Sequence, residues 1–435
     1  MRNNMSIKFR LIIMNFLQFA VWGAYLTSMS RYLGPAGLGS HIGIFYSVQG
    51  IVSIFMPALI GIIADRWIPA QKMLGICHLL SAMFMLSVGL YGLSANSIVS
   101  FPIIFTLYTF SVAFYMPTLA LSNSVAYNIL NQFNYDTVKE FPSIRVFGTI
   151  GFIISMWVVD LLGFQDSAMQ FVLSGGIGIL LGLYAFSLPN CLPNGLHNSM
   201  KSFGKSLGLD AFKLFKQKKM AIFFIFSMFL GVSLQITNGF ANPFIASFEF
   251  LPEYSNTFGV KHSNILISLS QVSETLCILL IPFFLKKYGI KIVMLIAMFA
   301  WVLRFAFFGL GNPGNGIWLL VLSMLVYGVA FDFFNISGSL FVDKETKPEI
   351  RSSAQGLFML MTNGIGATVG TLAAQAVVNV FCKWTDVTIG SQTKSMLIGD
   401  WSSVWYIFAG YALVVALLFA ILFKNKYTMK EETQK

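Results

Sequence analysis

The stretch ISLSQVSETLCILL, residues 267–280, has the composition of a membrane-spanning helix but carries two polar side chains near its centre. Most of its residues suit the interior of a lipid bilayer, yet Gln271 and Glu274 stand three residues apart. On a helix, this spacing places both side chains on one face. An acid at mid-membrane costs about 2.5–3.5 kcal/mol on insertion scales, so such a residue usually faces a cavity and has a function.

The composition of the whole chain agrees with a membrane protein. The 435 residues are 56% hydrophobic and only 10% charged, and the mean hydropathy is +0.74. A water-soluble domain carries about 25% charged residues, so too little polar surface is present to cover a soluble protein of this size. The sequence therefore predicts an all-α integral membrane protein.

Twelve apolar stretches are long enough to cross the hydrocarbon core, which takes about 17–25 residues. The predicted spans are 9–30, 42–64, 73–95, 101–128, 145–164, 168–188, 220–247, 263–285, 291–310, 316–341, 353–381 and 402–423. The first span is preceded by Arg2, Lys8 and Arg10, and no small-residue cleavage site follows it. We therefore expect a retained helix rather than a signal peptide.

The distribution of the basic residues predicts the orientation in the membrane. The net charge is +11, and most of the Lys and Arg residues fall in the termini and in the even-numbered connections between spans. This positive-inside bias predicts that both termini are cytoplasmic. The excess charge is thus explained by topology, and we expect no nucleic acid as a partner.

A basic segment divides the chain into three predicted parts. Residues 1–188 form an N-terminal six-helix half, 189–219 form a cytoplasmic basic linker, and 220–435 form a C-terminal six-helix half with a cytoplasmic tail. In the linker, apolar residues near one face are flanked by lysines, which is typical of a helix on the inner membrane surface. A flexible linker explains the same pattern equally well. The repeated pattern Pro-x-Ile-Arg, at 142–145 and 348–351, favours two halves related by a parallel repeat.

The stretch GIIADRWIPAQK, residues 61–72, resembles the Gly-x-x-x-Asp-Arg…Lys loop of the major facilitator superfamily. In that reading, Gly61 allows a close approach of helices, and Asp65 with Arg66 forms a charge latch on the cytoplasmic side. Ile68 and Pro69 stand where that loop usually has a glycine. The twelve spans and the central linker agree with the same fold.

Polar residues at helical spacing recur in other predicted spans. Gln235 and Asn238 repeat the i, i+3 pair in the seventh span, and Asp332 and Asn335 repeat it in the tenth. For an isolated residue such as Gln18, hydrogen bonds between helices and a place in a cavity fit equally well, but pairs on several helices favour a polar cavity.

Two features leave alternatives open. Arg304, inside the ninth span, fits a structural ion pair as well as a substrate contact. Tyr327, Phe331, Phe333 and Phe334 surround Asp332; they fit a ring-stacking wall or ordinary packing.

Long segments of the chain resemble the bacterial nucleoside permeases, the nucleoside:proton symporters of the major facilitator superfamily. They include FLQFAVWGAYLTS, FPSIRVFGTIGFI, LQITNGF, SQVSETLCILLIPFFL and VYGVAFDFFNISGSLFV. The resemblance covers about residues 8–424 and is weakest in the loop 382–401.

The resemblance implies proton-coupled uptake of nucleosides across the bacterial inner membrane by alternating access. The substrate would bind in a central cavity between the halves of a monomer, with no cofactor and no metal. The implied substrate-binding set, carried over motif by motif, is Arg145, Thr149, Phe152, Gln235, Asn238, Gln271, Glu274, Tyr327, Phe331 and Asp332. Both acids, Asp332 and Glu274, are candidates for the coupling proton; of the two, we expect Asp332 to carry it and Glu274 chiefly to hold the sugar.

Other functions fit parts of the same pattern. Carboxylates and amides grip any polyol, so a proton-coupled sugar symporter is an alternative, and sodium is an alternative coupling ion. A membrane receptor without transport is another class of reading, although no signalling domain is appended. An enzyme is disfavoured because the four histidines are scattered along the chain and the acids stand at mid-span.

Overall fold

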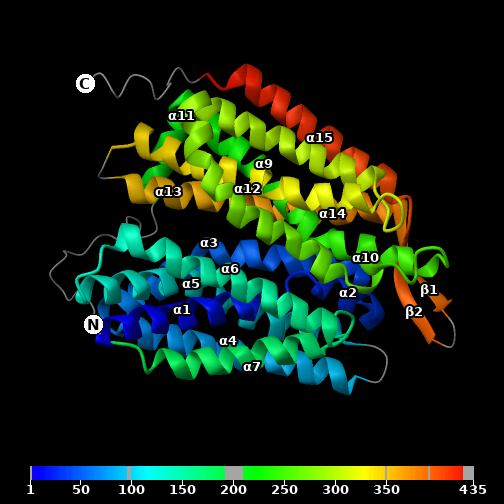
Figure 1. Cartoon of the computed structure of the whole chain (residues 1–435), viewed down its shortest axis with the longest axis horizontal. Coiled ribbons are helices and arrows are strands. Elements are labelled where there is room, and N and C mark those ends of the chain that lie inside the picture. The colour runs from blue at the N-terminus through cyan, green and yellow to red at the C-terminus, as the bar shows by residue number, and fades with distance from the viewer. Residues whose placement is uncertain (1, 96–98, 192–208, 348–349, 390–391, 425–435) are drawn as a thin grey trace. The chain divides into compact units, whose positions relative to one another are not determined.

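The computed structural model describes residues 2–95, 99–191, 209–347, 350–389 and 392–424 (Figure 1). Within these residues, nine helices are long and apolar enough to cross a membrane. Each of the twelve predicted spans is occupied largely by helix, and large apolar side chains such as Leu279 and Ile421 are exposed on the helix surfaces. The predicted all-α membrane fold is confirmed.

The chain divides into two compact units, of which the first comprises Met1–His41 and Ile51–Ser206. Its elements are α1 (Arg2–Gly23), α2 (Met29–Leu33), η1 (Gly34–Leu38), η2 (Gly39–His41), most of α3 (Ile42–Arg66), α4 (Ala70–Ser94), α5 (Phe101–Gln132), α6 (Thr137–Leu161) and α7 (Met169–Ala185).

The second unit comprises Ile42–Gly50 and Leu207–Lys435. Its elements, besides the start of α3, are η4 (Leu209–Lys216), α9 (Lys218–Ala246), η5 (Ser247–Phe250), α10 (Phe258–Lys261), α11 (Ser263–Leu310), α12 (Ile317–Glu345), α13 (Arg351–Met359), η6 (Leu360–Gly366), α14 (Ala367–Phe381), β1 (Cys382–Ile389), β2 (Gln392–Gly399) and α15 (Trp401–Leu422). The division into domains at 188 and 219 stays a prediction.

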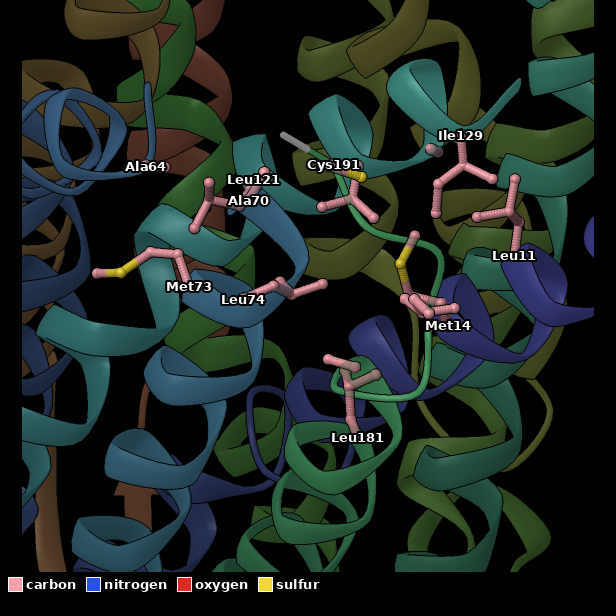
Figure 2. Close-up of a cluster of buried hydrophobic side chains, with 14 of the residues drawn as sticks. Leu11, Met14, Ala64, Ala70, Met73, Leu74, Leu121, Ile129, Leu181 and Cys191 are labelled. Atoms are coloured by element: carbon pink, nitrogen blue, oxygen red, sulfur yellow. The ribbon is translucent and has the colours of Figure 1, made fainter. Parts of the chain in front are cut away.

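The core of the first unit is a cluster of buried apolar side chains contributed by several helices (Figure 2). Leu11 and Met14 come from α1, Leu74 from α4 and Leu181 from α7. The chain after α7 is tied back to α4, because Gln71 donates to Asn190 at 2.7 Å and accepts from the Cys191 amide at 2.9 Å. This anchor fixes the start of the predicted linker.

Helix α11 contains both the eighth and the ninth predicted span in its 48 residues. Gly289 interrupts it with a non-helical backbone (φ 75°, ψ 169°). This positive φ costs glycine little, whereas most other residues adopt it only with strain. Gly289 therefore separates a first arm of α11, residues 263–288, from a second arm, residues 290–310.

The eleventh predicted span is helical but irregular. Its middle, η6, is a π-helix, a form that is rare outside short insertions in α-helices. Glycines let α9 approach it: a Cβ on Gly231 would overlap the carbonyl of Thr362, and one on Gly370 would lie 2.6 Å from Val232 Cα. The pairing of small residues with backbone is typical of close helix contacts in membranes.

Strands β1 and β2 form an antiparallel hairpin between α14 and α15, in the loop that resembles the family least. The register pairs Cys382 with Gly399. An ion pair attaches the hairpin to the end of α9: Nζ of Lys394 lies 2.7 Å from a carboxylate oxygen of Glu249, which belongs to η5 directly after α9. These two strands were not predicted from the sequence.

Two predictions concern the end of the second predicted span: the charge latch and the close approach of helices at Gly61. The side chains of Asp65 and Arg66 lie outside the described residues, so the latch stays a prediction. A Cβ on Gly61 would meet no described atom within 4 Å. The expected close approach of helices at Gly61 likewise stays a prediction.

In the linker, residues 192–208 lie outside the described residues and η4 is a 3-10 helix. Leu214 is buried, Phe212 is 44% exposed, and the Phe215 ring lies 5.4 Å from that of Phe224. Placement of η4 on the membrane surface stays a prediction.

Candidate functional site

Helices α11 and α12 meet backbone to backbone beside Glu274. A Cβ on Gly328 would lie 2.5 Å from the carbonyl oxygen of Ser273 and 2.8 Å from the amide of Glu274. The hydroxyl of Ser273 donates to the carbonyl of Leu325 across the same contact. Because no side chain separates the helices here, residues on either side of Gly328 stand close to Glu274.

Tyr327, next to Gly328, links the two predicted carboxylates. Both Glu274 and Asp332 lie close enough to interact electrostatically with its hydroxyl. Asp332 is 5% exposed, and Glu274 is half-buried. The structure thus gathers two acids and one phenol on adjoining faces of α11 and α12.

Phe331 and Tyr327 form a parallel pair of rings, with centroids 5.6 Å apart and planes 5° apart. Trp301 packs edge-on against Tyr327 at 6.0 Å. Phe333 and Phe334, by contrast, are fully buried among other aromatic rings. Phe333 and Phe334 are therefore core, as ordinary packing predicts. The half-buried Phe331 stacks on Tyr327, and its role as a ring-stacking wall stays a prediction.

The two amide pairs differ in how far the protein satisfies them. On α9, Asn238 donates to Gln235 at 3.3 Å, and both side chains are half-buried. On α11, the side-chain oxygen of Gln271 is buried and accepts no hydrogen bond from the described residues. A buried acceptor left in this state costs about 1–3 kcal/mol, so Gln271 is suited to a donor from a ligand.

Arg304 lies on the second arm of α11 and is 2% exposed. Its Nη1 donates to the carbonyl of Ser323 at 2.7 Å and to the hydroxyl of Ser270 at 3.3 Å. Its guanidinium lies 4.6 Å from the centre of the Tyr327 ring. Among the described residues, no ion pair joins Arg304 to a carboxylate, so the ion-pair reading is not supported.

In the first unit, the three predicted residues of α6 lie along its contact with α1. The guanidinium of Arg145 lies 3.8 Å from the centre of the Phe19 ring. Phe152 meets Trp22 edge-on, with centroids 6.2 Å apart and planes 87° apart. Thr149 is half-buried between them on the same helix. These side chains share one face of α6, as their spacing predicts.

Gln18, also on α1, belongs to a hydrogen-bonded network inside the first unit. Its amide donates to Thr118 at 2.7 Å, and its oxygen lies 2.7 Å from Nε2 of His78. The hydroxyl of Tyr115 donates to the backbone carbonyl of Gln18 at 2.8 Å. Gln18 thus joins α1 to α4 and α5, and its interpretation as a link between helices is confirmed.

Sequence reasoning did not single out Gly328, Ser270 or Ser323. The four-residue interval from Ser323 to Tyr327 to Phe331 was a usable signal, because it aligns all three on one stripe of α12. The role of Gly328 had no such signal, since glycines are frequent in membrane helices.

The fold and these polar groups within apolar helices are those of a multi-pass membrane transporter. The model of the family described as nucleoside H+ symporter matches residues 5–428. The chain therefore belongs to the nucleoside H+ symporter family.

Individual relatives cover nearly the whole chain. The nucleoside permease NupG of Escherichia coli (strain K12) is 46% identical over 426 residues, covering 97% of each chain. The xanthosine permease of the same organism is also 46% identical, with the same coverage. The crystal structure of the nucleoside transporter NupG superposes with a TM-score of 0.85, covering 97% of this chain and 100% of that one. The fold is that of the major facilitator superfamily, and the chain is a multi-pass inner-membrane protein.

Proposed function

We propose that this protein takes up nucleosides across the inner membrane together with protons, by alternating access. Its relatives named as nucleoside and xanthosine permeases support this substrate class. The observation that carries the proposal is the buried, unsatisfied oxygen of Gln271 on the helix that packs against the parallel rings of Tyr327 and Phe331. A nucleobase offers what this arrangement lacks, namely N–H donors and a flat aromatic face.

Each group in the second unit has a proposed task. A base stacks on Phe331, the half-buried ring of the parallel pair with Tyr327, because aromatic faces attract the face of a base regardless of its identity. The amides of Gln235, Asn238 and Gln271 pair with the base edge, since each amide has both donors and acceptors. Glu274 accepts hydrogen bonds from the ribose hydroxyls.

In the first unit, Arg145, Thr149 and Phe152 supply the remaining predicted contacts. Arg145 and Thr149 offer donors on the same face of α6, and Phe152 offers an aromatic edge. The expected cavity between the halves, the latch formed by Asp65 and Arg66, the cytoplasmic position of both termini and the monomeric state are parts of this proposal. The distribution of basic residues supports the orientation.

Asp332 is proposed as the proton carrier. It is almost fully buried, and it lies next to the rings and close to the Tyr327 hydroxyl. Moving one proton through 100 mV releases about 2.3 kcal/mol. At about 1.4 kcal/mol for each tenfold ratio, this energy supports roughly 50-fold accumulation of a neutral nucleoside.

The test compares two modes of radiolabelled uridine uptake in proteoliposomes. We expect Asp332→Asn to abolish uphill uptake driven by a proton gradient and to retain counterflow, which needs no net proton movement. Asp343→Asn, an exposed acid on the same helix paired with Arg351, is the matched control and should leave both modes unchanged. Survival of uphill uptake in Asp332→Asn would show that Asp332 is not the proton carrier.

Two sets of uptake measurements address the alternative substrate and the alternative coupling ion. An excess of free sugar should leave uridine uptake unchanged, and an excess of another nucleoside should abolish it; the opposite pattern would identify a sugar symporter. Replacing sodium with potassium should leave uptake unchanged, whereas a protonophore should abolish accumulation.

A further inference from the structure

Arg304 joins three helical segments at the centre of the second unit. It belongs to the second arm of α11, after the break at Gly289. Its two hydrogen bonds reach Ser270, on the first arm of α11, and Ser323, on α12. The hydroxyl of Ser323 returns a hydrogen bond to the carbonyl of Arg304 at 2.9 Å. One side chain therefore sets the position of α12 against both arms of α11.

The charge of Arg304 is balanced in an unusual way. Burying a cation is costly unless a carboxylate or several hydrogen bonds compensate it. None of the ion pairs in the described residues includes Arg304. Aromatic rings surround it instead: the guanidinium lies 4.6 Å from the Tyr327 centroid, 5.4 Å from Phe308 and 5.9 Å from Trp301. Tyr327 is the nearest of these rings.

The contact with Tyr327 has a direct consequence for Phe331. Ser323, Tyr327 and Phe331 follow one another at intervals of four residues along one stripe of α12. Arg304 holds the first through its carbonyl and the second through its ring. A planar guanidinium stacks on an aromatic face and so restricts the tilt of that ring. The parallel arrangement of Tyr327 and Phe331, with planes 5° apart, depends on that tilt.

We propose that Arg304 is a positioning residue for nucleoside binding, which holds Tyr327 in the orientation on which Phe331 stacks and so fixes the Phe331 ring that receives the base. The inference rests on the function proposed above. A side chain that becomes ordered only when the substrate binds reduces the affinity. Arg304 orders the Tyr327 ring beforehand, so Arg304 strengthens binding without contacting the substrate itself. Arg304 acts through Tyr327, and the two residues form one functional unit.

A double-mutant cycle on purified protein tests this role, with the dissociation constant of uridine measured by calorimetry. Tyr327→Ala should weaken binding about 30-fold, within the range for loss of one base–aromatic stack. Arg304→Met should weaken it about 10-fold, because the ring that Arg304 fixed must then be ordered on binding. The double variant should bind about as weakly as Tyr327→Ala alone. Multiplication of the two losses, to about 300-fold, would mean that Arg304 does not act through Tyr327 and would overturn the proposal.

Two further variants separate positioning from folding. Arg304→Lys keeps the charge but loses the planar fork, and it repeats the cycle should Arg304→Met not fold. Phe308→Leu alters another ring beside Arg304, one that packs on Trp405 at 4.5 Å. It should lower the unfolding temperature and leave the affinity for uridine unchanged. Loss of affinity in Phe308→Leu equal to that in Arg304→Met would reduce Arg304 to a general packing role.

These variants distinguish a wrong substrate site from a wrong positioning role for Arg304. Unchanged affinity in Tyr327→Ala would show that the proposed substrate site is wrong. Weakened affinity in Tyr327→Ala, together with unchanged affinity in both Arg304 variants, would leave the site in place and remove only the positioning role.

Discussion

Gln18 in the first unit and Gln271 in the second are both glutamines within apolar helices, yet the protein treats them differently. Gln18 is fully buried and hydrogen-bonded to Thr118 and His78 on two other helices. The side-chain oxygen of Gln271 is buried and accepts nothing from the described residues. A polar group that the protein satisfies stabilises the fold, whereas one that it leaves unsatisfied can be satisfied by a ligand. The hydrogen-bond partners of a glutamine, rather than its polarity, therefore distinguish a structural role from a ligand-binding role.

The largest effect is expected where the second unit brings its acids together. Gly328→Val would place a side chain against the backbone of Ser273 and Glu274. We expect loss of measurable uridine binding and a destabilisation of about 1–3 kcal/mol or more, as for overpacked cores. Gly410→Ala on α15, where a Cβ meets no described atom within 4 Å, is the control and should change neither property. Normal binding by Gly328→Val would mean that the contact of α11 with α12 does not organise the site.

The two glutamines themselves give the next largest effect, in opposite measurements. Gln271→Ala should weaken uridine binding about 10-fold with little change in the unfolding temperature. Gln18→Ala should leave binding within about threefold and destabilise the fold by about 1–3 kcal/mol, because it abandons buried partners. Calorimetry of both purified variants measures the affinity for uridine, and thermal unfolding measures their stability. The same phenotype in both variants would remove the basis of the comparison.

A smaller effect is expected at Asp400, the N-cap of α15, whose partners are again part of the protein. Its carboxylate accepts from the amide of Ser403 at 3.1 Å and from its hydroxyl at 2.5 Å. These bonds favour the charged form and hold the pKa of Asp400 below its ordinary value of 3.8. A lowered folded pKa means that the stabilisation is present above the unfolded pKa and is lost as the pH falls through the folded pKa.

Asp400→Ala should therefore lower the unfolding temperature by a few degrees at neutral pH, with uridine affinity unchanged. Thermal unfolding across an acid series should show this difference shrinking once the pH is below 3.8. Asp400→Asn keeps a capping oxygen without the charge, so its difference from Asp400→Ala should not vary with pH. A constant difference between the native protein and Asp400→Ala throughout the series would contradict the assigned cause.

The smallest effect is expected at the hairpin. Glu249→Gln removes the ion pair with Lys394, whose side chains are 18% and 31% exposed. Partly exposed pairs contribute little, so the loss should stay below about 1 kcal/mol and should shrink further in high salt. Asp386→Asn, on the exposed side of β1, is the control. A loss of several kcal/mol in Glu249→Gln would show that the hairpin does more than cover the end of α9.

The sequence predicts the helices well and the partners of their polar residues poorly. Apolar length is a property of each segment, so the twelve spans could be found one by one. The hairpin of β1 and β2, with eight residues in each strand, was not predicted because it stands between two strong helical signals. Gln18 shows the limit most clearly: spacing distinguishes it, as an isolated glutamine, from the paired Gln271, but it does not reveal partners as distant as Thr118 and His78.

The close contact at Gly328 also bears on how the acids can move. Since backbone touches backbone there, a one-residue screw of α12 against α11, about 1.5 Å along its axis and 100° around it, would bring the side chain of Tyr327 or Val329 into the space that only a glycine can occupy. The first arm of α11 and the neighbouring part of α12 must then turn as one lever. Glu274 and Asp332 are carried on that lever together, so a single motion would change the surroundings of the proposed sugar-binding acid and of the proposed proton carrier at the same moment.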